Sequence, residues 1–316
     1  MTTKESVTVR GLSSKATIGV FSPSEPIVES RVERFKRGLS ILEGHGFGVK
    51  LSKNYLAKQG YMAGTIDERI DDIHDLVRDN EVDALIASWG GKSCNHLIKK
   101  LDYQLIARAK KPMMGFSDVA VLLNAITAHT GLITFHGPNI VGKLDETKHS
   151  DLGLLTGKSQ EGANLLGTSA QTLAQTIKEG SVSGRLFGGN LSTFILSLFY
   201  VDVPPDFWDG KIFFWEEASM PPQLIDQYLT GLANCGLLGR IGGMVIGSFI
   251  HEEPVDWKRV DALQSLRSVL SGYRYPILYC PNFGHSSLEN PLLPIGAYCN
   301  LNAGAGTLQM LEQVFD

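Results

Sequence analysis

Residues 82–88 read Val-Asp-Ala-Leu-Ile-Ala-Ser, and a pair of glycines, Gly90-Gly91, follows one residue later. A short apolar run that stops at glycine is typical of a buried strand ending in a tight turn. Similar runs in the first half of the chain predict further strands at residues 16–21, 112–116 and 132–135. Stretches with helical spacing of apolar residues follow three of the four, at residues 32–46, 93–101 and 118–129. This alternation predicts an α/β fold with a parallel, doubly wound sheet, on which ligands bind at the carboxyl ends of the strands.

The alternation weakens between residues 144 and 184, where Lys, Glu, Ser, Thr, Gly and Gln dominate. We place a domain boundary in this region, with a first domain at 1–165 and a second at 166–316. The second half alternates again, with strands expected at 211–215 and 243–247 and helices at 191–199, 222–238 and 255–270.

The composition narrows the class of protein. Of 316 residues, 43% are hydrophobic and 20% charged, which is a globular profile. The net charge of −4 provides no basic patch for nucleic acid or for a membrane surface. The N-terminus lacks a signal-peptide core, and no apolar run could span a bilayer. The four cysteines form no C-x-x-C pair, so we expect a cytoplasmic protein with free thiols.

The sharpest local feature is Gly115-Phe116-Ser117-Asp118, which places a serine between a predicted strand and a predicted helix. Such a turn lifts a serine hydroxyl above the sheet and presents the next backbone N–H at a helix N-terminus, where it could stabilise an oxyanion. An ordinary helix-capping serine is the competing interpretation, since the second glycine of G-x-S-x-G is missing.

The glycine pair Gly90-Gly91 could bring a backbone N–H close to a ligand. It could equally be a tight turn between strand and helix. A phosphate-binding loop is disfavoured, because neither G-x-x-x-x-G-K-[ST] nor G-x-G-x-x-G occurs.

Two carboxylates and a few histidines complete the candidates. Glu216 and Glu217 end a predicted strand, where a carboxylate could orient a histidine, although both could be solvated turn residues. His285 lies in a glycine-bearing loop and is the candidate general base, with His136 and His251 as alternatives that also follow strands. No H-E-x-x-H pair occurs, so we expect no catalytic metal.

Taken in their order along the chain, several segments resemble the LD-carboxypeptidase family of serine peptidases. They are Gly90-Gly91, Gly115 to Asp118, residues 130–138 (Thr-Gly-Leu-Ile-Thr-Phe-His-Gly-Pro), residues 186–192 (Leu-Phe-Gly-Gly-Asn-Leu-Ser), residues 214–217 (Phe-Trp-Glu-Glu), residues 283–285 (Phe-Gly-His) and residues 293–296 (Leu-Pro-Ile-Gly). The resemblance extends from about residue 16 to residue 300.

The resemblance implies a flavodoxin-like N-terminal domain, a smaller α/β C-terminal domain, and a site between them. By position, it implies that Ser117 is the nucleophile, His285 the base and Glu216 its orienter, with the N–H groups of Gly91 and Asp118 as the oxyanion hole. It also implies a homodimer that needs no metal or organic cofactor.

The family has two main branches, which differ in substrate. One releases D-alanine from murein tetrapeptides, and the other resembles the microcin C self-immunity protein, which cleaves a toxic aminoacyl-nucleotide. The loop at Gly90-Gly91 is closer to the second branch, because Trp89 stands where the murein branch usually has Arg. Ser93 and Cys94 replace the usual Asn and Ser, and Gln227 stands where arginine is common, so both departures bear on the substrate.

Two other classes compete with this interpretation. The chain could be a non-catalytic peptide- or nucleotide-binding module that keeps only the cleft. A relative of the class I glutamine amidotransferases is disfavoured, because that chemistry uses cysteine where this chain has Ser117.

Overall fold

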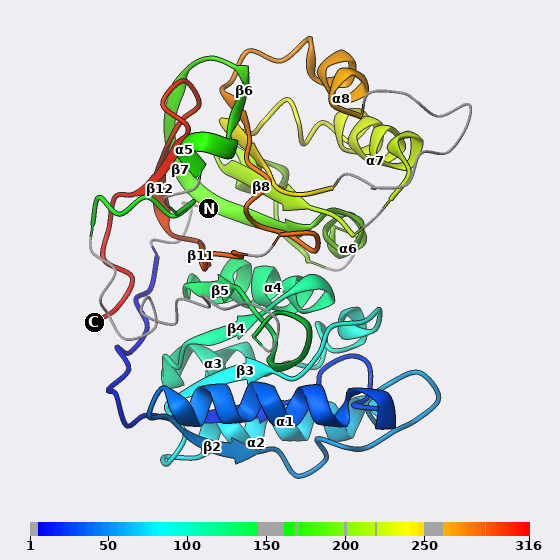
Figure 1. Ribbon diagram of the computed structural model, residues 1–316, viewed down its shortest axis with the longest axis vertical. Helices are drawn as coiled ribbons and strands as arrows, with labels where there is room; N and C mark the ends of the chain where they lie inside the picture. Colours follow the sequence, from blue (N-terminus) through cyan, green and yellow to red (C-terminus); the bar gives the residue numbers. More distant parts are fainter. Residues whose placement is uncertain are drawn as a thin grey trace.

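The computed structural model describes residues 6–144, 161–167, 170–198, 201–218, 220–249, 262–287 and 289–316. Two α/β domains lie one above the other in Figure 1, the first coloured blue to green and the second green to red. Within the described ranges, no helix is long and apolar enough to cross a membrane.

The first sheet has six strands in the order β11-β5-β4-β3-β1-β2. Five are parallel: β1 (Thr17–Phe21), β2 (Gly48–Leu51), β3 (Ala84–Ala87), β4 (Met113–Gly115) and β5 (Thr134–His136). All but β2 were predicted from the sequence. The sixth, β11 (Leu293–Ile295), comes from near the end of the chain and pairs antiparallel with β5. The first sheet is therefore completed by a segment that the sequence assigned to the second domain.

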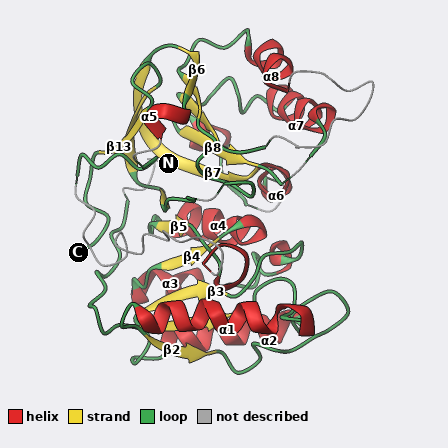
Figure 2. Cartoon of the chain, in the orientation of Figure 1, coloured by secondary structure: helices red, strands yellow, loops and turns green. Residues whose placement is uncertain are grey.

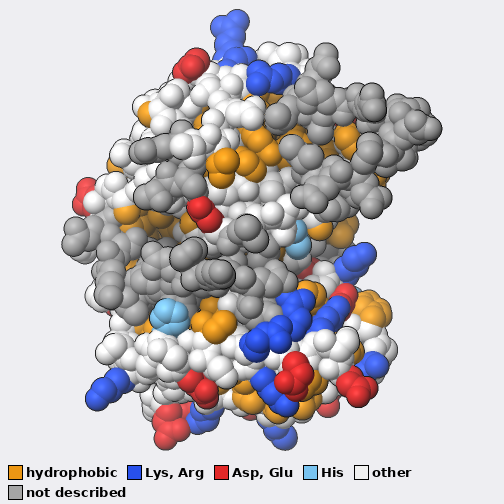
Figure 3. Space-filling model, in the orientation of Figure 1, with side chains coloured by type: hydrophobic (Ala, Val, Ile, Leu, Met, Phe, Trp, Pro, Cys, Tyr) orange, Lys and Arg blue, Asp and Glu red, His pale blue; other side chains and the backbone are white. Residues whose placement is uncertain are grey.

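Helices cover both faces of this sheet. One face carries α1 (Glu29–Gly44), and the other carries α2 (Ile66–Arg78), α3 (Tyr103–Ala109) and α4 (Ala120–Thr130), which pack side by side (Figure 2). On the face shown in Figure 3, basic and acidic side chains are interspersed over α1, so neither sign of charge forms a continuous patch there.

The second sheet has seven strands in the order β13-β12-β7-β8-β9-β10-β6. Its parallel centre is β7 (Ser181–Asn190), β8 (Ile212–Glu216), β9 (Gly243–Ile246) and β10 (Ile277–Tyr279), flanked by β6 (Gln175–Lys178), β12 (Tyr298–Asn302) and β13 (Thr307–Met310). Its helices are α5 (Ala170–Leu173), α6 (Leu191–Ser197), α7 (Pro222–Asn234) and α8 (Ala262–Leu270).

One predicted helix was wrong. Residues 93–101 form only a one-turn 3₁₀ helix, η1 (Cys94–His96), followed by turns. Ser93, where that helix would begin, has φ −135° and ψ 8°, outside the helical range. The helix predicted at 118–129 begins as the 3₁₀ turn η2 (Ser117–Val119) and continues as α4. The first part of the helix predicted at 255–270 lies outside the described residues.

The two domains are joined through α4. Asn124 of this helix donates a hydrogen bond from Nδ2 to the carbonyl of Gly188 (2.7 Å) and accepts one from the Gly188 N–H (3.2 Å). Gly189 packs so closely that an added Cβ would lie 2.5 Å from Ala120 Cβ. Gly189 therefore lets β7 approach the helix that begins just after Ser117.

Candidate active site

Ser117 lies in the sharp turn between β4 and α4. Its φ angle is +61°, a left-handed conformation that non-glycine residues adopt rarely and that recurs at functional turns. Asn139 holds the preceding residue, because its Oδ1 accepts from the Phe116 N–H (2.8 Å) and its Nδ2 donates to the Phe116 carbonyl (3.3 Å). Ser117 Oγ makes no helix-capping hydrogen bond, so the capping interpretation is wrong.

The hydroxyl instead meets a histidine from the other domain. His285 Nε2 lies 3.1 Å from Ser117 Oγ, and His285 Nδ1 lies 2.6 Å from Glu216 Oε2. Glu216 ends β8 and is completely buried, whereas the His285 side chain is about one-quarter exposed. Three residues that are far apart in the sequence thus form one continuous hydrogen-bonded chain across the domain junction.

A glycine makes this contact possible. Gly284 has φ +115°, and an added Cβ would lie 2.8 Å from Glu216 Cβ and 2.3 Å from Ser248 Oγ. Only glycine suits both this conformation and this proximity. The loop can therefore place the backbone N–H of His285 2.9 Å from the same Glu216 oxygen.

The environment keeps Glu216 ionised. Burial is the largest single influence and raises the pKa of its carboxyl, but the charge of His285 and the hydrogen bonds from it together outweigh burial. The pKa of Glu216 therefore lies below its ordinary value. A carboxylate in this position can hold the imidazole with Nδ1 protonated and Nε2 facing the serine.

His136 lies behind this chain rather than in it. It is buried, its ring contacts Phe116 and Phe214, and its Nε2 has no hydrogen-bond partner among the described residues. Burial lowers the pKa of His136 to about 4, so the ring is neutral near pH 7. It is not among the residues that line the cavity at Ser117, so it is not the alternative base. His251, the other alternative, lies outside the described residues.

The loop that carries Gly90-Gly91 packs directly against the serine turn. A Cβ on Gly90 would lie 3.0 Å from Ser117 Cβ. Gly91 has φ +144°, and a Cβ there would lie 2.5 Å from Ser24 Oγ and 2.6 Å from Glu25 Cγ. Neither the Gly91 N–H nor the Asp118 N–H donates to another described group. Both remain available at the mouth of the turn.

The side chain of Asp118 fastens the two loops together, which the sequence did not reveal. Its Oδ2 accepts hydrogen bonds from Ser24 Oγ (2.5 Å) and from the backbone N–H groups of Ser93 and Cys94 (both 2.8 Å). The guanidinium of Arg69, which is 1% exposed, donates to the carbonyl (3.2 Å) and hydroxyl (3.0 Å) of Ser93. An aspartate in the first turn of a helix is common, so the position of Asp118 in the sequence did not indicate these contacts.

Glu217, the neighbour of Glu216, has a different role. It lies just after β8 and is 3% exposed, and its carboxylate accepts from Asn190 Nδ2 (2.8 Å) and from the N–H of Ser192 (2.9 Å). Neither glutamate is a solvated turn residue. Glu217 holds the start of α6, whereas Glu216 meets the histidine.

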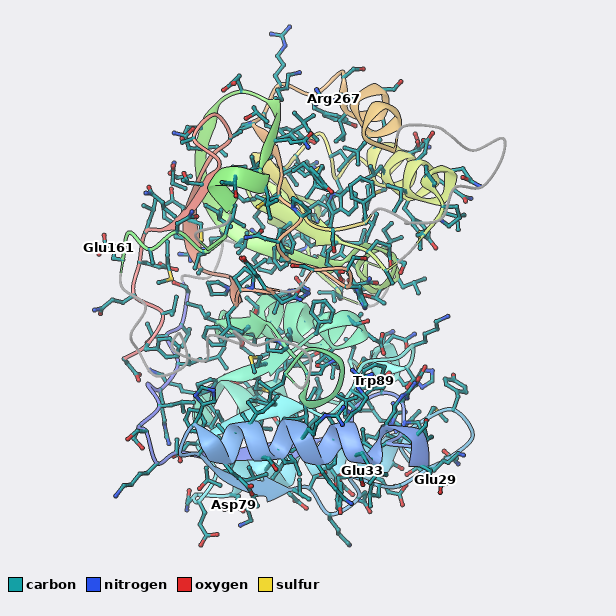
Figure 4. All side chains as sticks on the ribbon, in the orientation of Figure 1. Glu29, Glu33, Asp79, Trp89, Glu161 and Arg267 are labelled. Carbon is teal, nitrogen blue, oxygen red and sulfur yellow. The ribbon has the colours of Figure 1, made fainter. Side chains whose placement is uncertain are left out.

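A cavity of about 320 Å³ opens beside Ser117. Its lining joins the serine turn and His285 to Glu25, Trp89, Gly90, Gly91, Phe116, Asn139, Val141 and Gly142. Trp89 lies near the domain junction (Figure 4), and the Arg31 guanidinium stacks on its ring at 4.5 Å from the centroid. Arg31 also pairs with Glu25 at 3.2 Å. The cavity therefore combines an aromatic wall with a carboxylate that Arg31 holds in place.

A serine in a strained turn, bonded to a histidine whose other nitrogen meets a buried carboxylate, is the arrangement of serine hydrolases. The LD-carboxypeptidase N-terminal domain model matches residues 18–137, and the C-terminal domain model matches residues 183–301. The chain therefore belongs to the LD-carboxypeptidase family and is a serine-type carboxypeptidase.

Individual relatives agree with this assignment. The probable murein peptide carboxypeptidase of Bacillus subtilis (strain 168) is 32% identical, over 94% of this chain and 92% of that protein. The microcin self-immunity protein MccF of Escherichia coli is 27% identical, over 94% of this chain and 93% of that one. A solved structure of MccF superposes with a TM-score of 0.87 at 25% identity, covering 98% of this chain and 99% of that one.

Proposed function

We propose that Ser117 is the nucleophile of this carboxypeptidase, His285 its general base and Glu216 the residue that orients the base. The observation that carries this proposal is the continuous hydrogen-bonded chain from Ser117 Oγ through His285 to Glu216 Oε2. We also propose the domain division at 1–165 and 166–316, so that the first domain supplies the serine and the second supplies the histidine and the glutamate.

The reaction is acyl transfer to water. His285 Nε2 takes the proton of Ser117 while Oγ attacks the carbonyl carbon, and the N–H groups of Gly91 and Asp118 bind the oxyanion. One such donor contributes about 3–4 kcal/mol to transition-state stabilisation. His285 then gives its proton to the leaving amine as the C–N bond breaks. Water, deprotonated by His285, attacks the acyl-enzyme and restores the serine.

The substrate that we propose is a small aminoacyl-nucleotide or peptide of the kind represented by processed microcin C. Trp89 supports this choice, because it replaces the arginine expected in the murein branch and provides an aromatic wall for the cavity. MccF has also been solved in complex with aspartyl sulfamoyl adenosine. Release of D-alanine from a murein tetrapeptide is the alternative, favoured by the name of the Bacillus subtilis relative.

The test compares turnover of an aminoacyl sulfamoyl-adenylate with turnover of a murein tetrapeptide at equal concentrations of enzyme. Cleavage of the adenylate supports the proposed substrate, and robust cleavage of the tetrapeptide alone overturns it. A Trp89→Ala variant should lose affinity for the adenylate more than for the peptide, because only the nucleotide has a base to stack.

The role of Ser117 is tested separately with a fluorophosphonate probe. The probe should label the wild type at Ser117 and leave the Ser117→Ala variant unlabelled. A wild type that resists labelling at Ser117 would favour a non-catalytic binding module. Full hydrolysis by Ser117→Ala would overturn the assignment of the nucleophile.

We further propose that the protein acts in the cytoplasm as a homodimer, as the family resemblance implies. Size-exclusion chromatography with light scattering measures the oligomeric state, and a monomer at micromolar concentration would contradict this proposal.

A further inference from the structure

A second cavity, of about 230 Å³, lies at the domain junction and shares no lining residue with the cavity at Ser117. The C-terminal end of α4 forms one wall, and β7 and the segment from residue 202 to residue 211 form the other. The eleven residues of α4 correspond to about 16 Å of helix, so the two cavities lie roughly at opposite ends of α4.

Lys211 is the notable group in this second cavity. The residue is only 3% exposed, and its Nζ lies 4.0 Å from the ring centroid of Phe207 and 5.4 Å from that of Phe187. Within the described part of the chain, this ammonium makes no hydrogen bond and no ion pair. Contacts with two aromatic rings offset only part of the cost of burying a charged ammonium. Lys211 is therefore a buried cation with no carboxylate of the described residues in direct contact.

The other charged groups around the cavity differ from Lys211. Arg185 already pairs with Glu312 (3.0 Å) and donates to the carbonyl of Gly296. Asp202 and Asp206 are exposed on the cavity rim, and His129 lies at the end of α4. Burial, followed by the charge of Arg185, lowers the pKa of Lys211 to about 8, although Asp209 and Asp206 act in the opposite direction.

We propose that the second cavity binds a small organic carboxylate, whose charged end contacts Lys211. The cavity has room for about seven waters, which is the size of a small organic acid. Its walls include Phe187, Val203 and Phe207, which suit an apolar body next to the carboxylate. The carboxylates of Asp202 and Asp206 at the rim repel a polyanion such as phosphate.

The charges around the rim also distinguish two kinds of carboxylate. A simple acid such as acetate would contact Lys211 alone. A free amino acid carries an ammonium that Asp202 or Asp206 could bind in addition. Affinity for either is expected to correspond to a Kd on the order of 1 mM.

The experiment is methyl NMR on the full-length protein with labelled Ala and Val. Ala128 and Val203 report on the second cavity, and Val141 reports on the cavity at Ser117. Acetate, D-alanine and inorganic phosphate are titrated separately. We expect saturable shifts of Ala128 and Val203 with acetate, and with D-alanine at lower concentration if the rim carboxylates contribute. Phosphate that binds as tightly as acetate, or shifts that do not saturate, would overturn the proposal.

Two variants separate the site from general charge effects. Lys211→Met should abolish the shifts of Ala128 and Val203, while Arg240→Met, which removes an exposed cation paired with Asp209, should leave them unchanged. The Val141 signal shows whether each variant is folded. Unchanged binding in a folded Lys211→Met protein would refute the assignment.

A third test measures how the affinity of the wild-type protein for acetate depends on pH. Because the free ammonium of Lys211 loses its proton above pH of about 8, affinity for acetate should fall tenfold per pH unit above that value. Affinity that stays constant from pH 7 to pH 10 would exclude Lys211 as the contact.

Discussion

One oxygen of Glu216 accepts two hydrogen bonds from His285, one from ring Nδ1 at 2.6 Å and one from the backbone N–H at 2.9 Å. The same atom therefore fixes both the backbone and the ring of the histidine. The second oxygen, Oε1, is buried and has no hydrogen-bond partner among the described residues. Glu216 thus holds His285 through one carboxylate oxygen.

Replacing this carboxylate should disable the reaction while the fold remains. We expect Glu216→Gln to lower kcat by about 10³–10⁴-fold, because an amide favours the wrong tautomer of the histidine. The measurement is steady-state turnover. Glu217→Gln is the matched control, since Glu217 is equally buried but holds Asn190 and Ser192. It should lower the melting temperature and leave kcat within about threefold. Equal losses of kcat in both variants would contradict the separate roles.

A methyl group on Gly91 should displace the loop that we assign to the oxyanion hole. Its φ of +144° and the 2.5 Å approach to Ser24 Oγ make alanine strained, at a cost of about 1–3 kcal/mol. We expect kcat to fall about 10²-fold, because the N–H leaves its position. Gly231→Ala, in the last turn of α7 with no atom within 4 Å of the added Cβ, should instead stabilise the protein by up to about 1 kcal/mol. Normal turnover by Gly91→Ala would remove Gly91 from the oxyanion hole.

The carboxylate of Asp118 should affect both stability and rate. Asp118→Asn weakens three hydrogen bonds that hold Ser24, Ser93 and Cys94, and we expect unfolding to become easier by about 1–3 kcal/mol and kcat to fall at least tenfold. Urea unfolding and turnover measure the two effects.

Asp72 offers a matched comparison in the same domain. It is 3% exposed and accepts from Ser52 Oγ and from the N–H and side chain of Asn54, far along the chain from the serine turn. Asp72→Asn should cost similar stability without reducing kcat. A matching loss of kcat in Asp72→Asn would mean that Asp118 acts through stability alone.

His136 should make the fold sensitive to mild acid. In the folded protein its pKa is about 4, whereas in the unfolded chain it takes a proton near pH 6.5, so the unfolded state binds more protons between these values. The contribution of the neutral His136 to the free energy of unfolding is complete above pH 6.5. It falls by up to about 3 kcal/mol as the pH is lowered toward 4.

The check is urea unfolding of the wild type and His136→Gln from pH 7.5 to pH 5. The free energy of unfolding should fall more steeply for the wild type. Other titrating groups, such as the buried His74, act in both proteins and cancel in the comparison. Parallel curves would show that His136 is not responsible.

Much of this architecture follows from local sequence. Six strands are short runs of apolar residues, and this pattern was enough to predict them from the sequence: β1, β3, β4, β5, β8 and β9. The edge strand β2 and the amphipathic helix α2 were missed, because β2 has alternating polar residues and α2 carries many charges. The helix predicted at 93–101 is reduced to the turn η1, and Ser93 before it has φ −135° while its N–H and that of Cys94 donate to Asp118.

The candidate site also contains residues that the sequence indicated and contacts that it did not. Ser117, Glu216 and His285 could be selected because each follows a predicted strand, and family resemblance joined them across 168 positions. No sequence pattern indicated the side-chain contacts of Asn139 with Phe116 or of Asn124 with Gly188. Those contacts join segments whose proximity exists only in the folded chain.

The pairing of β11 with β5 has a consequence for the order of events during synthesis. A ribosome that has released the first half of the chain has made Ser117 and the parallel strands, but the edge of β5 has no partner until Leu293–Ile295 emerges. His285 emerges just before that segment. Ser117 therefore meets His285 only after residues 285–295 have been made, so a nascent chain that ends before them carries the serine without the histidine that contacts its hydroxyl.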